Sequence, residues 1–260
     1  MACSPETAAA SALTGVITDP RTLEMAYPRF VEPEVIRINA AMLMPPGPDY
    51  AASQLEKGPN IQPLPQFDSL PEVLEGPVLL KVGDNISTDE IMPAGAKVLP
   101  YRSNIPKISK FVFAQVDESY SDRALKHQKQ GSFVVGGYNY GQGSSREHAA
   151  LAPRYLGIKT VIAKSFARIH WQNLVNFGIL PLTFVRPNDW EMIKQEDVLT
   201  ITDLGRAIQK GKRISVCNLT RNETYETEHS MSDRQIEIVL KGSLVNVVRD
   251  RQKNFSPSQP

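Results

Sequence analysis

Short apolar runs bounded by glycine, proline and polar residues recur along the chain from Pro77 onward. Runs of this kind are typical of buried strands, and apolar residues at helical spacing lie between several of them. The predicted strands are Val78–Val82, Ser132–Val135, Thr160–Ala163, Leu180–Thr183, Val198–Ile201 and Arg213–Val216, and the predicted helices are Arg146–Leu156, Phe166–Phe177 and Ser232–Lys241. This alternation predicts an α/β fold. The close spacing of the later strands favours a mixed sheet or open barrel over a purely parallel sheet.

The segment before Pro77 has a different pattern. Ser4–Gly15 predicts a short helix, because serine suits an N-cap, proline the first helical position and glycine the C-terminal end. Pro28–Pro77 holds ten of the twenty prolines and predicts an extended linker, with at most a short strand at Val35–Ile38. An Ala-rich helix this short is marginal alone, so we expect it to belong to a larger body.

These patterns divide the chain into four parts. We expect a helix of a preceding domain in residues 1–26, a linker in 27–76, the α/β domain in 77–253 and a disordered tail in 254–260. No apolar run is long enough to cross a bilayer, and the Ala-rich start lacks the basic region of a signal peptide, so we expect a cytoplasmic protein.

Charge and cysteine content narrow the chemistry. With 29 basic and 28 acidic residues the chain lacks the basic excess typical of nucleic-acid-binding proteins. Cys3 and Cys217 are its only cysteines, and the four histidines show no metal-ligand spacing, so we expect no metal site in this chain.

The glycine-rich segment Gly136–Gly157 (GGYNYGQGSSREHAALAPRYLG) carries the clearest chemical signal. Its glycines permit sharp turns, and Ser144, Ser145, Arg146 and Glu147 are predicted to open a helix. A helix N-terminus and a guanidinium together suit a carboxylate. The alternative is a capping box between Ser144 and Glu147, although arginine in a first turn opposes the helix dipole. Neither a P-loop nor a dinucleotide-binding motif fits this sequence.

Two further segments are candidates for the same site. Val82–Arg102 places Asp84, Asp89 and Glu90 after the first predicted strand, with Arg102 following. The acidic residues could equally form a turn, and Arg102 could be a solvated surface residue. In the third segment, which begins at Ala163, Arg168 and His170 are candidates for supporting or packing roles.

These three segments together resemble the swivel domain of the aconitase superfamily. The matching stretches are GDNISTDEIMPAG, YNYGQGSSREHAAL and KSFARIHWQNLVNFGILPL, in the same order as in the family, and the resemblance runs from about Pro77 to Gly242. The resemblance implies a swivelling β/β/α domain. It also implies that the short helix closes the preceding cluster-bearing domains, and that the proline-rich stretch links them to the swivel domain.

The resemblance also implies roles for individual residues. In the family this domain closes over a [4Fe–4S] cluster held by cysteines of other domains, so the cluster is not expected to be ligated by this chain. Ser144 corresponds to the base and Asp89 to an acidic residue that supports proton transfer. Arg102, Ser145 and Arg146 correspond to groups that bind substrate carboxylates, and Glu147, His148, Arg168 and His170 are assigned to the surrounding shell. Glu90 departs from the histidine that many aconitases carry there.

Arg102 favours a tricarboxylate, and hence an aconitate hydratase acting on citrate, cis-aconitate and isocitrate. Glu90 and the stretch NLVNFGILPL, which resembles the isopropylmalate branch, favour the compact bacterial type. The alternatives are the small subunit of an isopropylmalate or homoaconitate isomerase, or a non-catalytic module. The partner would be cluster-bearing domains or a large subunit. Because the chain begins within the predicted closing helix, we expect a truncated product rather than a natural subunit, and an isolated chain without activity.

Overall fold

The computed structural model describes residues 3–26, 29, 31–36, 38–48 and 54–254, and these form two units whose boundary falls between Leu55 and Glu56. In the first unit, helix α1 (Pro5–Thr14) is capped by the Ser4 hydroxyl and ends at Gly15 in the left-handed conformation, as predicted. A 3-10 turn, η1 (Pro20–Thr22), follows. The short strand predicted at Val35–Ile38 is absent from the described residues of that stretch, and position 37 lies outside them.

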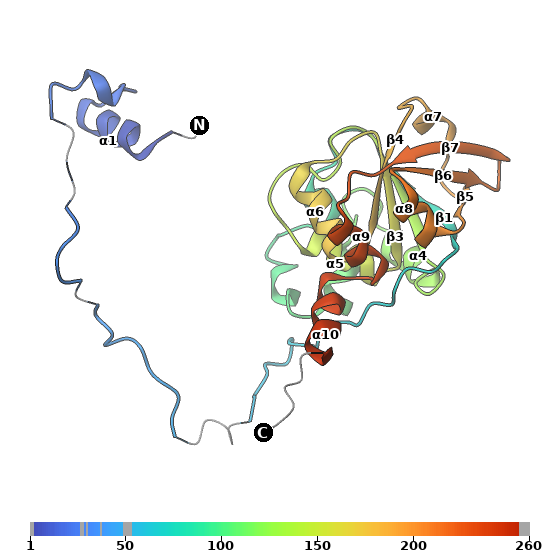
Figure 1. Ribbon diagram of the computed structural model, residues 1–260, viewed down its shortest axis with the longest axis horizontal. Helices are drawn as coiled ribbons and strands as arrows, with labels where there is room; N and C mark the ends of the chain where they lie inside the picture. The colour runs from blue at the N-terminus through green and yellow to red at the C-terminus, as the bar shows by residue number, and fades with distance from the viewer. Residues whose placement is uncertain (1–2, 27–28, 30, 37, 49–53, 255–260) are drawn as a thin grey trace. The chain divides into compact units, whose positions relative to one another are not determined.

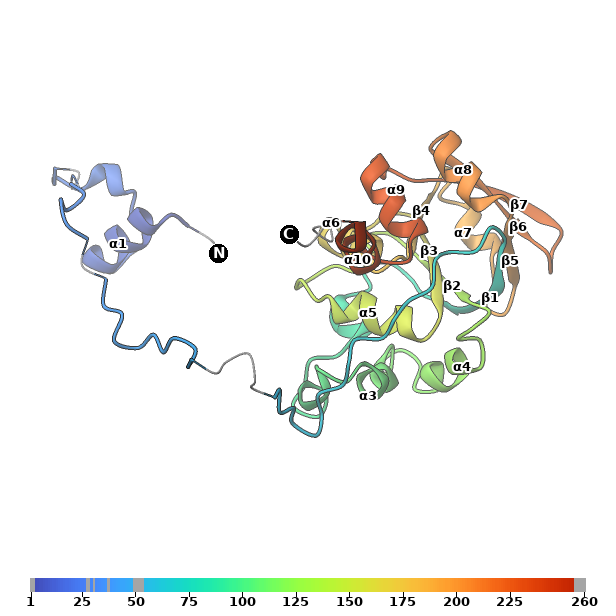
Figure 2. The same ribbon diagram turned by 60° about the horizontal axis from the view of Figure 1, so that its bottom comes forward.

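The second unit contains a closed barrel of seven strands in the order β1-β2-β3-β4-β7-β6-β5 (Figures 1 and 2). The pairs from β1 to β4 are parallel, and the remaining four pairs are antiparallel. The strands are β1 (Leu74–Lys81), β2 (Ser132–Gly136), β3 (Ile158–Ala163), β4 (Leu180–Phe184), β5 (Val198–Ile201), β6 (Arg213–Asn218) and β7 (Glu223–Glu228). The predicted α/β class with a mixed, barrel-like sheet is confirmed. The barrel is closed rather than open, because β5 pairs with β1.

Short helices connect the strands. They are α2 (Thr88–Ile91), η3 (Leu99–Tyr101), α3 (Ile105–Ile108), η4 (Ser109–Phe111), α4 (Tyr120–Lys126), α5 (His148–Tyr155), α6 (Arg168–Asn176), α7 (Asp189–Met192), α8 (Leu204–Lys210), α9 (Asp233–Leu240) and α10 (Leu244–Asn254). Figure 2 shows α3, α4 and α5 on one side of the parallel strands and α8 and α9 on the other. Asn254 ends α10, and the rest of the predicted tail lies outside the described residues. None of the helices in the described ranges is long and apolar enough to cross a membrane.

The pattern of burial explains the layers. Phe133, Val135 and Ile162 pack in a cluster to which all seven strands and the helices α6, α8, α9 and α10 contribute. Their neighbours Val134 and Val161 belong to a second cluster with the helices, because successive residues of a strand point to opposite faces. Strands β2 and β3 are therefore buried on both sides, whereas β6 and β7 alternate between buried and exposed positions.

Residues 56–76 belong to the second unit, although their proline content assigns them to the predicted linker. Arg154, only 3% exposed, donates a hydrogen bond to the backbone carbonyl of Asp68 (2.7 Å), and the Asn246 side chain donates to that of Phe67 (2.7 Å). Leu70 pairs with the Leu240 carbonyl through its amide. These bonds hold the residues before β1 against the barrel.

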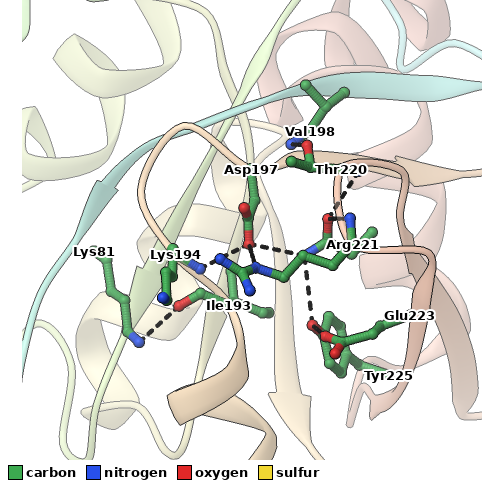
Figure 3. A network of polar contacts seen from close by, with 10 residues as sticks. Lys81, Ile193, Lys194, Asp197, Val198, Thr220, Arg221, Glu223 and Tyr225 are labelled. Carbon is green, nitrogen blue, oxygen red and sulfur yellow. Dashed lines mark hydrogen bonds and ion pairs between the residues drawn. The ribbon is translucent and has the colours of Figure 1, made fainter.

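A polar network lies where β1 and β5 pair to close the barrel, a contact called the seam below (Figure 3). The buried Asp197 carboxylate accepts hydrogen bonds from the Lys194 amide (2.8 Å), the Asn218 side chain (2.9 Å) and Arg221 Nε (2.8 Å). Its backbone carbonyl accepts from the amide of Val78 in β1. A single residue therefore ties β1, β5 and β6 together.

Candidate functional site

The site is built on the loops that follow the parallel strands. Since parallel strands end at the same edge, the loops after β1, β2 and β3 meet there. The amide of Asn85 donates to the Tyr138 carbonyl (2.8 Å), the amide of Gly141 to the Ile86 carbonyl (2.8 Å), and the amide of Tyr140 to the Ser165 carbonyl (2.9 Å). The three segments singled out in the sequence are thus brought together by backbone hydrogen bonds.

The Gly137 and Gly141 positions explain why glycine precedes the serine pair. A Cβ on Gly137 would lie 2.0 Å from Asp84 Oδ1, which accepts a hydrogen bond from the amide of Tyr138 (2.7 Å). Gly141 has a φ of +79°, and a Cβ there would lie 2.1 Å from the His170 ring. Only glycine permits both the left-handed turn and the close approach.

His170 lies directly beneath this turn. It is 1% exposed, its ring packs 5.5 Å from that of Tyr140, and neither ring nitrogen has a hydrogen-bond partner among the described residues. Burial lowers the pKa of His170 to about 4 and raises the pKa of Tyr140. The glycine-rich turn that leads to Ser144 therefore packs on the buried, uncharged rings of His170 and Tyr140.

The predicted helix start is wrong by two residues. Helix α5 begins at His148, with Glu147 at its N-cap and no side-chain cap. Ser144 and Glu147 do not form a capping box, Ser145 does not cap the helix, and Arg146 precedes the first turn. The glycine-rich turn keeps these residues out of the helix, because its backbone is bonded to the loop after β1.

Ser144 and Ser145 are exposed, and the Ser144 carbonyl accepts a hydrogen bond from Thr88 Oγ1 (3.0 Å). The Ser144 hydroxyl has no partner within the described part of the chain and is free of the capping role that the pattern allowed. Thr88, which the sequence did not single out, holds this serine in place.

Arg146 and Asp89 form a two-pronged ion pair, although Arg146 is 57 residues further along the chain. Arg146 Nη1 contacts Asp89 Oδ1, and Arg146 Nη2 lies 3.0 Å from Asp89 Oδ2. The Arg146 side chain is 22% exposed and that of Asp89 57% exposed. A planar guanidinium that meets one carboxylate in this way presents the geometry that a ligand carboxylate needs.

Glu90 has a structural role. Its carboxylate accepts from the amide and the hydroxyl of Ser87 (both 2.7 Å), while its own amide donates to the Ser87 hydroxyl (3.1 Å). This is a capping box at the start of α2. The turn-forming interpretation is therefore correct for Glu90, whereas Asp89 faces Arg146.

A pocket of about 220 Å³ opens beside the Arg146–Asp89 ion pair. Polar and charged groups come from Arg102, Ser145, Arg146, Glu147 and His148, and the apolar wall includes Met92, Val98 and Leu99. Arg102 is exposed, and its guanidinium has no partner within the described ranges. Arg168, at the exposed start of α6, does not line this pocket.

The described residues do not provide a site for an iron–sulfur cluster. Cys3 is exposed in the first unit and Cys217 is half-buried in β6. No group of three or more His, Cys, Asp or Glu residues that could hold a metal ion occurs within the described residues. A four-iron cluster typically needs several thiolates, so the residues of this chain do not fit that group.

The fold is thus a small α/β barrel with an arginine-lined pocket at the loops that follow its parallel strands. The chain belongs to the aconitase superfamily, as its swivel domain: residues 86–187 match the aconitase C-terminal domain family. The solved structure of a 3-isopropylmalate dehydratase from Methanocaldococcus jannaschii is 32% identical, with a TM-score of 0.57. The match covers 72% of this chain and 99% of that one.

Two curated relatives extend the comparison. A probable mitochondrial aconitate hydratase from Dictyostelium discoideum is 35% identical over 74% of this chain and 28% of its own length. A mitochondrial homocitrate dehydratase from Saccharomyces cerevisiae is 36% identical over 68% of this chain and 26% of its own length. The chain thus spans less than a third of these relatives, which are hydro-lyases by name.

Proposed function

We propose that this chain is the substrate-binding portion of an aconitate hydratase, the enzyme that interconverts citrate and isocitrate through cis-aconitate. The observation that carries the proposal is the pocket that Arg102 and Arg146 line together with Ser145. Two guanidinium groups from separate segments suit a ligand with several carboxylates. The cluster chemistry would come from cluster-bearing domains or a large subunit outside this chain.

The residues of this chain then have distinct tasks. Arg146 binds a substrate carboxylate in place of Asp89, and Arg102 binds a further one. Ser144 removes and returns a proton, a task for which a hydroxyl needs nearby positive charge to hold it as an alkoxide. Asp89, released from Arg146 by the substrate, supports that transfer.

A second candidate is the small subunit of an isopropylmalate dehydratase. The specific observation in its favour is that the match covers 99% of the 3-isopropylmalate dehydratase structure. Isopropylmalate carries an apolar branch where citrate carries its third carboxylate, so an arginine placed for that third carboxylate has no partner on isopropylmalate. Arg102 and its charge therefore separate the two candidates.

The test is a titration of the isotopically labelled chain with citrate and with isopropylmalate, followed by amide chemical shifts. We expect citrate to shift residues around Arg146, and Arg102→Leu to weaken citrate binding about tenfold, the loss of one charged hydrogen bond. Arg234→Leu, an exposed arginine on α9, is the matched control and should change neither titration. Isopropylmalate binding that exceeds citrate binding would favour the second candidate.

A further inference from the structure

His148 connects the segment that carries Arg102 with the start of α5, which follows Arg146. Its Nε2 lies 2.8 Å from the backbone carbonyl oxygen of Arg102, and its Nδ1 lies 3.2 Å from Glu147 Oε1. Its side chain is 16% exposed and lines the pocket. A carbonyl oxygen can only accept, so Nε2 carries the proton in this contact.

The backbone carbonyl of Arg102 lies at the C-terminal end of a short helical turn. Arg102 follows the 3-10 turn η3, and its amide already bonds to the Leu99 carbonyl. Carbonyls at a helical C-terminus lack partners within the turn, and an outside donor must satisfy them. His148, the first residue of α5, supplies that donor.

No other hydrogen bond or ion pair between described residues joins the stretch 93–104 to α5. The stretch is nevertheless the wall of the pocket that carries Val98, Leu99 and Arg102. Arg146 is fixed independently by Asp89. The His148 bond is therefore the hydrogen bond that ties the Arg102 backbone directly to α5, while the Ser103 carbonyl accepts from the Gln62 amide (2.8 Å) on another side.

We propose that His148 is a positioning residue that holds the Arg102 segment against α5, so that Arg102 and Arg146 face the same pocket. The consequence for a tricarboxylate ligand rests on the function proposed above. A ligand that engages Arg146 alone does not depend on His148, whereas one that also engages Arg102 does. His148 thus sets the preference for a ligand that engages both arginines.

Amide hydrogen exchange in the full 260-residue chain tests the positioning role directly. The amides of Tyr101, Arg102 and Asn104 are bonded within the segment and report its opening. We expect His148→Leu to speed their exchange roughly three- to tenfold, the effect of one lost hydrogen bond. His148→Gln, whose amide can donate to the same carbonyl, should restore the slow rates.

Two controls separate positioning from general loosening. Exchange of the β6 amides should be unchanged in every variant, and Glu147→Gln, which alters only the Nδ1 contact, should leave the Arg102 segment within about twofold of the parent rate. If His148→Leu does not fold, His148→Asn replaces it, because the shorter amide falls short of the carbonyl. Unchanged exchange at Tyr101, Arg102 and Asn104 in the folded variant would overturn the proposal.

A citrate titration of the same variants tests the consequence. We expect His148→Leu to weaken citrate binding roughly three- to tenfold, with recovery in His148→Gln and no effect on a monocarboxylate such as acetate, which can engage Arg146 alone. Citrate binding that is equal in the parent and in His148→Leu contradicts the link to ligand preference. If the parent binds no citrate, the proposed function fails, and the exchange rates still decide the positioning role.

Discussion

At the scale of single residues, Arg146 and Asp89 form the two-pronged ion pair of the candidate site. The pair is partly exposed, so its net contribution to stability is small, about 0–1 kcal/mol. Its main effect is geometric, because it keeps a flexible guanidinium in one place. In the function proposed above, Asp89 therefore occupies the position on Arg146 that a substrate carboxylate would take.

His170 gives a prediction about acid stability. Its pKa is about 4 in the folded chain against 6.5 for the unperturbed group, since burial disfavours the charged ring. Between these pH values the unfolded chain binds a proton that the folded chain does not, so stability falls as the pH falls from 6.5 to 4. The full loss is about 3 kcal/mol.

We therefore expect His170→Phe to flatten that part of the stability curve. Phenylalanine keeps a ring beneath Gly141 and removes two unpaired polar atoms, so stability at pH 7 should be equal or higher. Urea unfolding between pH 4 and 7 measures both effects. His127→Phe, on a half-buried ring in another part of the unit, is the matched control. An undiminished slope in His170→Phe would show that other groups titrate there.

The glycine-rich turn is the element that connects His170 to the serine pair. Gly141→Ala should destabilise the chain by about 2–4 kcal/mol, because it combines a left-handed φ with overlap against the His170 ring. Adding His170→Ala should recover part of this loss by removing the ring. Gly95→Ala, where a Cβ meets nothing within 4 Å, should change thermal stability little. A similar loss in the single and double variants would mean that backbone strain alone is responsible.

The sequence predicts elements well where local pattern decides them. The strand at Val198–Ile201 and the capped helix α1 have the predicted bounds because apolar runs and capping residues are local signals. Strand β7 was missed because ETYETE has no apolar run, and only Tyr225 and Thr227 of it are buried. Its place is set by pairing with β6 and β4.

The candidate site shows the same limit. The motifs identify Arg102, Ser144 and Arg146, but no local pattern places Asp89 opposite Arg146 or His148 against the Arg102 carbonyl. The predicted start of α5 is wrong because Ser144 and Glu147 have the spacing of a capping box, which normally marks a helix N-terminus. That spacing does not reveal the backbone hydrogen bonds that keep the turn outside the helix. The four-part division of the chain and the roles of the site residues remain predictions.

At the scale of the whole second unit, barrel closure depends on the seam at Asp197. Burial opposes ionisation of this carboxyl, but hydrogen bonds from Lys194, Asn218 and Arg221 outweigh it, and the pKa is lowered from 3.8. The stability that these bonds contribute is present above pH 3.8 and is lost as the pH falls through the folded pKa.

We expect Asp197→Ala to lower the free energy of unfolding by about 2–4 kcal/mol at pH 7, because it leaves the buried Asn218 amide with only a longer contact to the Tyr225 hydroxyl (3.4 Å). Calorimetry at pH 7 and pH 3 provides the check, and the difference from the parent should shrink at the lower pH. Glu196→Ala, the exposed neighbour, is the control. An equal difference at both pH values would mean that the carboxylate charge contributes nothing to the seam.

The wall that carries Arg102 lies between α2 and α3 and contributes no residue to any strand of the barrel. Its replacement would leave the barrel's closure and the interior side chains untouched. If this stretch binds a carboxylate as proposed, a change in ligand preference would require new residues only there, with a donor at the start of α5 to anchor it.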